Sequence, residues 1–216
     1  MSGILDDIAS LQKSNRRRAV TLLLVVALVS LSVLSGYLYL RMDEYHDAKY
    51  RSQSVIMHEL SSNSALASYD VATVANTSIP VPERALAGTS AHHELTFLSR
   101  LALSIREMYL DDSEKNATFA GVFDAVSMYD AGVTSINVFL IWNVTNGWAM
   151  TEMPNVTARL STAAPLLLDL SRALESGFKS DVDFEKHPYS VVARLDLGSI
   201  RDISDSMINT LSGMGD

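Results

Sequence analysis

The chain has 216 residues, a formal net charge of −8 and no cysteine, which excludes disulfides, thiol catalysis and cysteine-ligated metal centres. From residue 41 onward, 23 Asp and Glu outnumber 13 Lys and Arg, giving a net charge of −10. An acidic balance of this size argues against nucleic acid as a partner.

Residues 1–18 form a short basic tail. Lys13 and the three residues from Arg16 to Arg18 lie within six residues, whereas Arg41, Lys49 and Arg51 are spread over eleven. Because positive flanks favour the cytoplasmic side of a membrane, we expect residues 1–18 to be a cytoplasmic tail or leader. The bulk of the chain is then extracytoplasmic.

The uncharged run at 19–40 has 22 residues, 13 of them Leu or Val. A helix of this length spans about 33 Å, and the hydrocarbon core of a bilayer is about 30 Å thick. A cleaved secretory signal has a shorter apolar region and a small-residue cleavage site. This run instead ends in Tyr37, Tyr39 and Arg41, which are typical of a membrane interface. The sequence therefore predicts a single transmembrane helix at the cell membrane, with the lipid bilayer as its partner.

The segment at 41–80 predicts a juxtamembrane helix that runs on from the membrane span. It contains no Gly or Pro before Pro80, and its apolar residues recur with a helical period. A second helix is expected at 90–110, with Ser90 as its N-cap, followed by a charged loop at 111–116 and a short helix at 117–129.

The residues at 134–144 and 147–153 are β-branched and aromatic, and Asn146-Gly147 lies between them. Asn-Gly between such runs predicts a β-hairpin. A helix at 161–177, a third strand at 188–199 and a closing amphipathic helix at 199–213 complete the pattern. The expected fold class is α+β: one transmembrane helix continuing into a long amphipathic helix, then an extracytoplasmic domain at 81–216 that is mostly helical with a small antiparallel sheet.

Motifs that carry chemistry are scarce. The chain has no phosphate-binding GxxxxGK[ST] loop, no GxGxxG, no GxSxG and no HExxH. His92, His93 and Glu94 are adjacent, but neighbouring helical side chains point about 100° apart, so they do not converge on one ion. Trp142 and Trp148 flank the expected hairpin. They fill a core or, alternatively, form an exposed aromatic contact. We therefore expect no enzyme activity, no catalytic residues, no metal and no cofactor.

Two weaker patterns concern the surface and the membrane helix. Ser32 and Gly36 are four residues apart, a spacing of small residues that lets another helix pack closely. Sequons for N-linked glycans all follow the apolar run, consistent with a glycoprotein whose outer face is exported. They occur at Asn76, Asn116, Asn143 and Asn155.

The stretch Arg18-Ala19-Val20-Thr21 with the apolar run after it resembles the leader site of archaeal type IV prepilins and pseudopilin-like proteins. The resemblance implies cleavage after Ala19, assembly through Val20–Leu40 and a small β-rich head. The sequence departs from that family at Leu24, where many bacterial pilins carry Glu, and in lacking the SPVIG run of many archaeal pilins.

Two hypotheses follow. In the first, the chain is a non-enzymatic single-pass signal-anchor protein whose extracytoplasmic domain binds a partner or ligand. In the second, it is a minor pilin or pseudopilin-like surface subunit. Both expect other membrane or surface proteins as partners, including further copies of the chain, and no nucleic acid.

Overall fold

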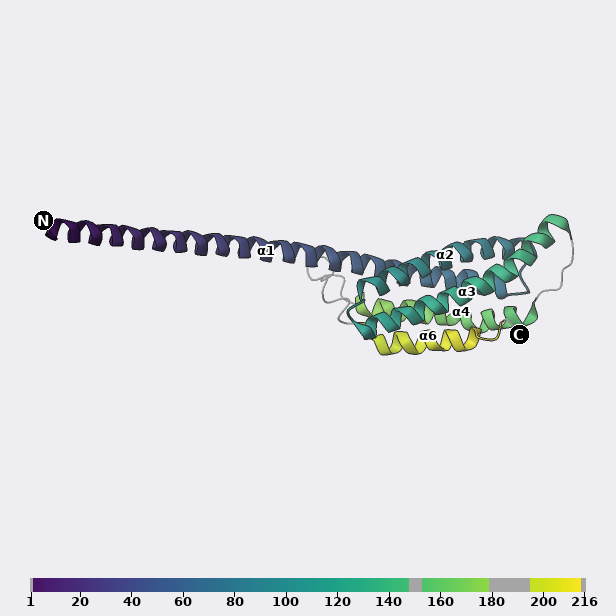
Figure 1. Ribbon diagram of the computed structural model, residues 1–216. Coiled ribbons are helices and arrows are strands. Elements are labelled where there is room, and N and C mark those ends of the chain that lie inside the picture. The colour runs from purple at the N-terminus through teal and green to yellow at the C-terminus, as the bar shows by residue number, and fades with distance from the viewer. Residues whose placement is uncertain (1, 148–152, 179–194, 215–216) are drawn as a thin grey trace. The chain divides into compact units, whose positions relative to one another are not determined.

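The computed structural model describes residues 2–147, 153–178 and 195–214 (Figure 1). Throughout these ranges the regular structure is helical, with no strand. The elements are α1 (Ser2–Ala75), α2 (Val81–Met108), α3 (Ser113–Asn146), α4 (Pro154–Glu175), the 3₁₀ helix η1 (Ser176–Phe178) and α6 (Leu197–Leu211).

The chain divides into two compact units, residues 1–49 and residues 50–216, with α1 contributing to both. In the first unit, every large hydrophobic side chain from Leu23 to Met42 is at least 53% exposed. Leu23–Tyr45 is long and apolar enough to cross a membrane. A stretch of this kind serves as a membrane anchor or as a signal sequence.

The second unit is a bundle of helices that lie side by side: α2 packs on α3, and α6 packs on both α3 and α4 (Figure 1). The part of α1 in this unit repeats buried residues at intervals of three and four, at Met57, Leu60, Ser64, Ala67 and Val71. This is the spacing of helices that pack nearly parallel or antiparallel. Hydrogen bonds from Ser61 to Ser171 and from Ser68 to Ala164 show that α1 and α4 run antiparallel.

The expected α+β fold is wrong, because the predicted strand at 134–144 is the second half of α3. Val133, Ile136 and Leu140 are fully or almost fully buried, which is a helical spacing. Propensity for strand at the β-branched residues is overridden by burial of this face, since tertiary packing outweighs intrinsic preference.

The predicted hairpin at Asn146-Gly147 is wrong for a related reason. Gly147 has φ 64° and donates its backbone N–H to Asn143 O, as the left-handed residue that ends α3. A hairpin turn and a helix C-terminus both call for a residue with positive φ, so the dipeptide alone does not distinguish them. Most of the second predicted strand, 147–153, and most of the third, 188–199, lie outside the described residues.

Two predicted helix starts also shift. α2 begins at Val81, after Pro80, rather than at Ser90, which is internal. The predicted charged loop at 111–116 contains the start of α3, where the Asp112 side chain accepts a hydrogen bond from Lys115 N at 3.1 Å. The Lys115 side chain and backbone N–H hydrogen-bond to Asp112 and hold the pKa of that carboxyl below its usual range. The closing helix is confirmed as α6.

Candidate functional site

The adjacent residues His92, His93 and Glu94 lie on α2 near two other helices, α1 and α3. The Nδ1 atom of His92 lies 2.6 Å from Asp130 Oδ1 and 3.3 Å from Thr134 Oγ1, both on α3. Glu94 instead interacts with Asp70 on α1. The described residues contain no group of three or more His, Asp or Glu side chains that could hold a metal ion.

The His92–Asp130 pair joins α2 to α3 at a partly exposed position, with 45% and 27% of the two side chains accessible. An aspartate on one imidazole nitrogen orients a histidine for base catalysis when the other nitrogen faces a nucleophile. Here the hydroxyl of Thr134 approaches the same nitrogen as the aspartate. The arrangement is therefore suited to fixing the register of two helices, not to activating a nucleophile.

Glu94 is the one carboxyl group in the described bundle whose pKa is strongly raised, to about 7. Partial burial is the largest cause, the negative charge of Asp70 adds to it, and a hydrogen bond with Ser90 opposes it. The Glu94 Oε2 atom is buried and has no hydrogen-bond partner within the described residues. The protonated and charged forms are thus both populated near neutral pH, because the charged form lacks solvation.

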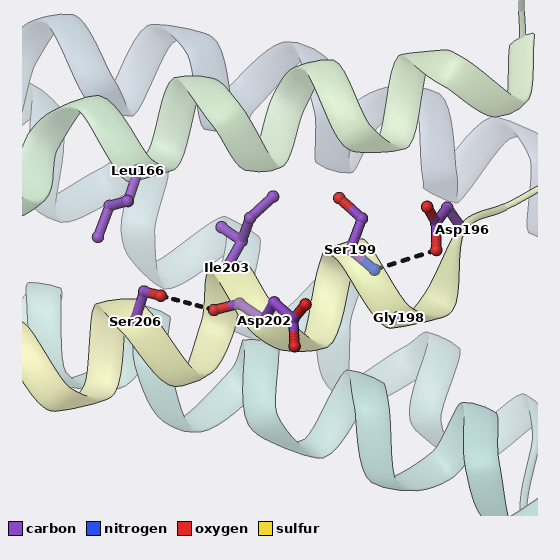
Figure 2. A pocket seen from close by; sticks show the side chains of 7 residues that line it. All are labelled: Leu166, Asp196, Gly198, Ser199, Asp202, Ile203 and Ser206. Atoms are coloured by element: carbon purple, nitrogen blue, oxygen red, sulfur yellow. Dashed lines mark hydrogen bonds between the residues drawn. The ribbon is translucent and has the colours of Figure 1, made fainter.

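A surface hollow of about 450 Å³ lies between α4 and α6 and is open to solvent (Figure 2). Its polar groups are mostly engaged: Asp196 Oδ1 accepts from Ser199 N at 3.0 Å, and Ser206 Oγ donates to Asp202 O at 2.7 Å. The first of these bonds caps α6. Figure 2 shows the Asp196 and Asp202 carboxylates well apart along α6, so they do not form a convergent ligand set.

The predicted sequons differ in their surroundings. Asn76 is exposed in the turn after α1, and its Oδ1 accepts from Ser78 N at 3.0 Å. Asn143 is half-buried within α3. The side-chain amides of the other two donate to backbone carbonyls, Asn116 to Arg106 O at 3.1 Å and Asn155 to Gly213 O at 3.2 Å. Asn76 and Asn155 are therefore exposed, whereas Asn116 and Asn143 are half-buried.

The residues predicted for processing and packing of the membrane helix all lie in α1. They are Arg18, Ala19 and Val20 at the leader motif, and Ser32 and Gly36 in the apolar run. A Cβ added at Gly36 meets no atom within 4 Å, and Ser32 is exposed. The small-residue face is therefore open.

The sequence pattern did not predict an exposed, uncharged line of residues on α3, which we call the outer seam. Its residues recur at intervals of four and three and are all exposed: Ala131, Ser135, Val138, Trp142 and Thr145. The sequence signal for this line was the charge-free run at 131–151, most of which was predicted to form strands and not helix. Trp142 is 49% exposed, so it does not fill the core, while Trp148 lies outside the described residues.

Comparison of the chain with protein-family models, with curated proteins and with solved structures finds no significant match. The functional argument therefore depends on the chain's own residues.

Proposed function

We propose that the chain is a single-pass membrane-anchored protein that binds a protein partner through a non-catalytic helical bundle outside the cytoplasm. The exposed apolar stretch Leu23–Tyr45 carries this proposal. Burying a Leu or Val side chain away from water contributes roughly 1.5–3 kcal/mol, so a line of such exposed side chains strongly favours transfer into lipid.

The end of the apolar stretch supports an anchor whose depth is fixed. Arg41 Nε donates to the Tyr37 hydroxyl at 3.1 Å, and the guanidinium lies 5.6 Å from the centre of the Tyr37 ring. Arg41 also approaches Glu44 at 3.5 Å. A tyrosine and an arginine in contact at the boundary of an apolar helix are typical of the headgroup region.

Membrane extraction and protease accessibility test this proposal. The full-length chain should remain in the membrane pellet after alkaline carbonate treatment. In right-side-out cells, protease should degrade the bundle but leave an epitope placed before Arg16 intact. Release by carbonate contradicts the anchor, and protection of the bundle contradicts the orientation.

A pilin-like subunit is the second candidate, favoured by the leader motif Arg18-Ala19-Val20 and by the apolar run that follows it. The resemblance implies a β-rich head, whereas the described head is helical. The mature amino terminus separates the two candidates. Mass spectrometry should find Met1 or Ser2 for the anchor and Val20 for the pilin-like subunit, and Ala19→Leu should block only the second.

A further inference from the structure

The outer seam of α3 is an uncharged helix face with large exposed apolar side chains, and no described helix covers it. Val138 is 48% exposed and Trp142 49%, and Ile141 beside them is 42% exposed. The opposite face of the same turns, at Ile136 and Leu140, is buried in the bundle. A helix with one buried face normally carries polar or charged residues on the other, so this second apolar face calls for a partner.

The distribution of charge leaves this face as the place where a second copy of the chain can approach. The chain beyond the apolar run has a net charge of −10, so two copies repel each other over most of their surface. From 131 to 151 there is no charged residue, which makes this the place where two acidic copies can meet. A helix that lies on a membrane surface usually carries Lys and Arg on its polar side, and this run has neither.

The spacing of the seam fits a helix pair. Residues 131, 135, 138, 142 and 145 follow the alternating intervals of four and three at which two helices interlock. The side chains of the seam are small at Ala131 and Ser135, where the backbones of two helices can approach closely. The side chains are larger at Val138 and Trp142, and tryptophan is among the residues that contribute most to the binding free energy of interfaces.

We propose that the outer seam of α3 is a homodimer interface, in which the seam of one copy packs against the same seam of a second copy. The inference rests on the proposed anchoring, because copies held in one membrane share one orientation and a raised effective concentration. Shared orientation favours a parallel pair in register, and a two-fold interface of this kind uses the same patch on both copies.

Cysteine cross-linking tests the interface directly, because the natural chain has no cysteine. Ser135→Cys lies on the seam, and Ser206→Cys on α6 is its matched control. Both serines are exposed, and each hydroxyl donates to the carbonyl four residues earlier, at 2.8 and 2.7 Å. In membranes holding the full-length chain, mild oxidation should give at least about fivefold more covalent dimer from Ser135→Cys, because a disulfide needs Cα atoms within about 7 Å.

A second substitution removes the contact without moving the cysteine. Trp142→Glu in the Ser135→Cys chain should reduce the dimer about fivefold or more, while Trp142→Phe should preserve most of it. Far-UV circular dichroism of each variant checks that the bundle remains helical. Equal dimer from Ser135→Cys and Ser206→Cys overturns the proposal, and so does cross-linking that Trp142→Glu leaves unchanged.

Lipid is the competing occupant of the seam. In a Trp148→Phe chain, Trp142 is the remaining tryptophan. Quenching of its fluorescence by brominated phosphatidylcholine, together with absence of the Ser135→Cys dimer, assigns the seam to the bilayer and overturns the dimer. Carbonate extraction of the same membranes tests membrane anchoring independently of cross-linking. A chain that is anchored but not dimeric therefore gives a different result from a chain that is not anchored.

Discussion

Three buried side chains bind the carbonyl groups of α4 from neighbouring helices. Ser61 Oγ donates to Ser171 O at 3.1 Å, Ser68 Oγ to Ala164 O at 2.8 Å, and the Tyr129 hydroxyl to Ala163 O. Pro165 lies within α4 beside two of these acceptors. Because proline lacks an N–H, Pro165 removes the helical donor of Ser161 O and disturbs the preceding turn. The hydroxyls of Ser68 and Tyr129 bind two other carbonyls of that turn and tie it to α1 and α3.

Removing one of these donors tests their contribution. Tyr129 is fully buried, and burial raises the pKa of its hydroxyl, which stays protonated and able to donate. Tyr129→Phe leaves Ala163 O without this partner and should lower the free energy of unfolding by about 1–3 kcal/mol. Tyr69→Phe is the control, because Tyr69 is 74% exposed, and its effect should stay within about 0.5 kcal/mol. Denaturant titration followed by circular dichroism measures both, and equal effects contradict the account.

Glu94 makes the stability of the bundle depend on pH. Its pKa is raised from 4.5 to about 7, so the folded state binds the proton more tightly than the unfolded state. The stabilisation is complete below the unfolded pKa, declines as pH rises from there, and is lost above the folded pKa. Glu94→Gln should therefore stabilise the bundle at about pH 8 and change little at about pH 4.

The size of this effect is on the order of 1 kcal/mol, reduced from the full shift because the side chain is partly exposed and screened. Thermal unfolding at several pH values measures it. Glu107→Gln, an exposed glutamate of the same helix, is the matched control. A gain from Glu94→Gln that is the same at both pH values contradicts the assignment of the effect to ionisation.

At the scale of elements, the contact between α2 and α3 depends on a glycine. A Cβ added at Gly88 would lie 2.5 Å from Asn137 Oδ1 and 2.6 Å from its Cγ, closer than real contacts allow. The Asn137 side chain therefore occupies the space that Gly88 leaves, in a part of the interface where both residues are buried. Close packing of this kind is sensitive to one added carbon.

Gly88→Ala should destabilise the bundle by about 1–3 kcal/mol, although alanine is the better helix former by about 1 kcal/mol. Asn137→Ala in the same chain opens the space again, so the double variant should lose less than the sum of the two single changes. Unfolding measurements on all four chains give the coupling energy. Strict additivity contradicts the proposed contact.

The elements that the sequence predicted well are those with one apolar face. α6 buries Ile200, Met207 and Leu211 at a helical spacing, which is a local signal, although its Asp196 cap lies before the predicted start at 199. The prediction of a strand at 134–144 was wrong because α3 carries uncharged residues on both its buried face and its outer seam. The hydrophobic pattern therefore shows no helical period, and only the β-branched and aromatic composition remained as a signal. The His92–Asp130 pair joins residues 38 apart, so it depends on helix register that local patterns do not encode.

At the scale of the whole molecule, α1 joins two units of opposite character. Its first part exposes apolar side chains, and its last part contributes buried residues to the bundle from Gln53 onward. Gln53 Oε1 accepts a hydrogen bond from the Tyr109 hydroxyl at 3.1 Å, so α1 contacts the rest of the bundle from Gln53 onward. The exposed apolar stretch thus consists of residues that the bundle core does not use.

A fragment comprising residues 50–216 should consequently fold without the apolar run. We expect it to stay in solution, to give a helical far-UV spectrum and to unfold cooperatively. A fragment of residues 62–216 is the matched control, because it lacks the buried Met57 and Leu60. Loss of a large core side chain costs about 2–5 kcal/mol, so the shorter fragment should unfold at markedly lower denaturant or fail to fold. Equal stability of the two fragments would show that α1 contributes no core to the bundle, and a strand-rich spectrum of the longer one would contradict the helical fold.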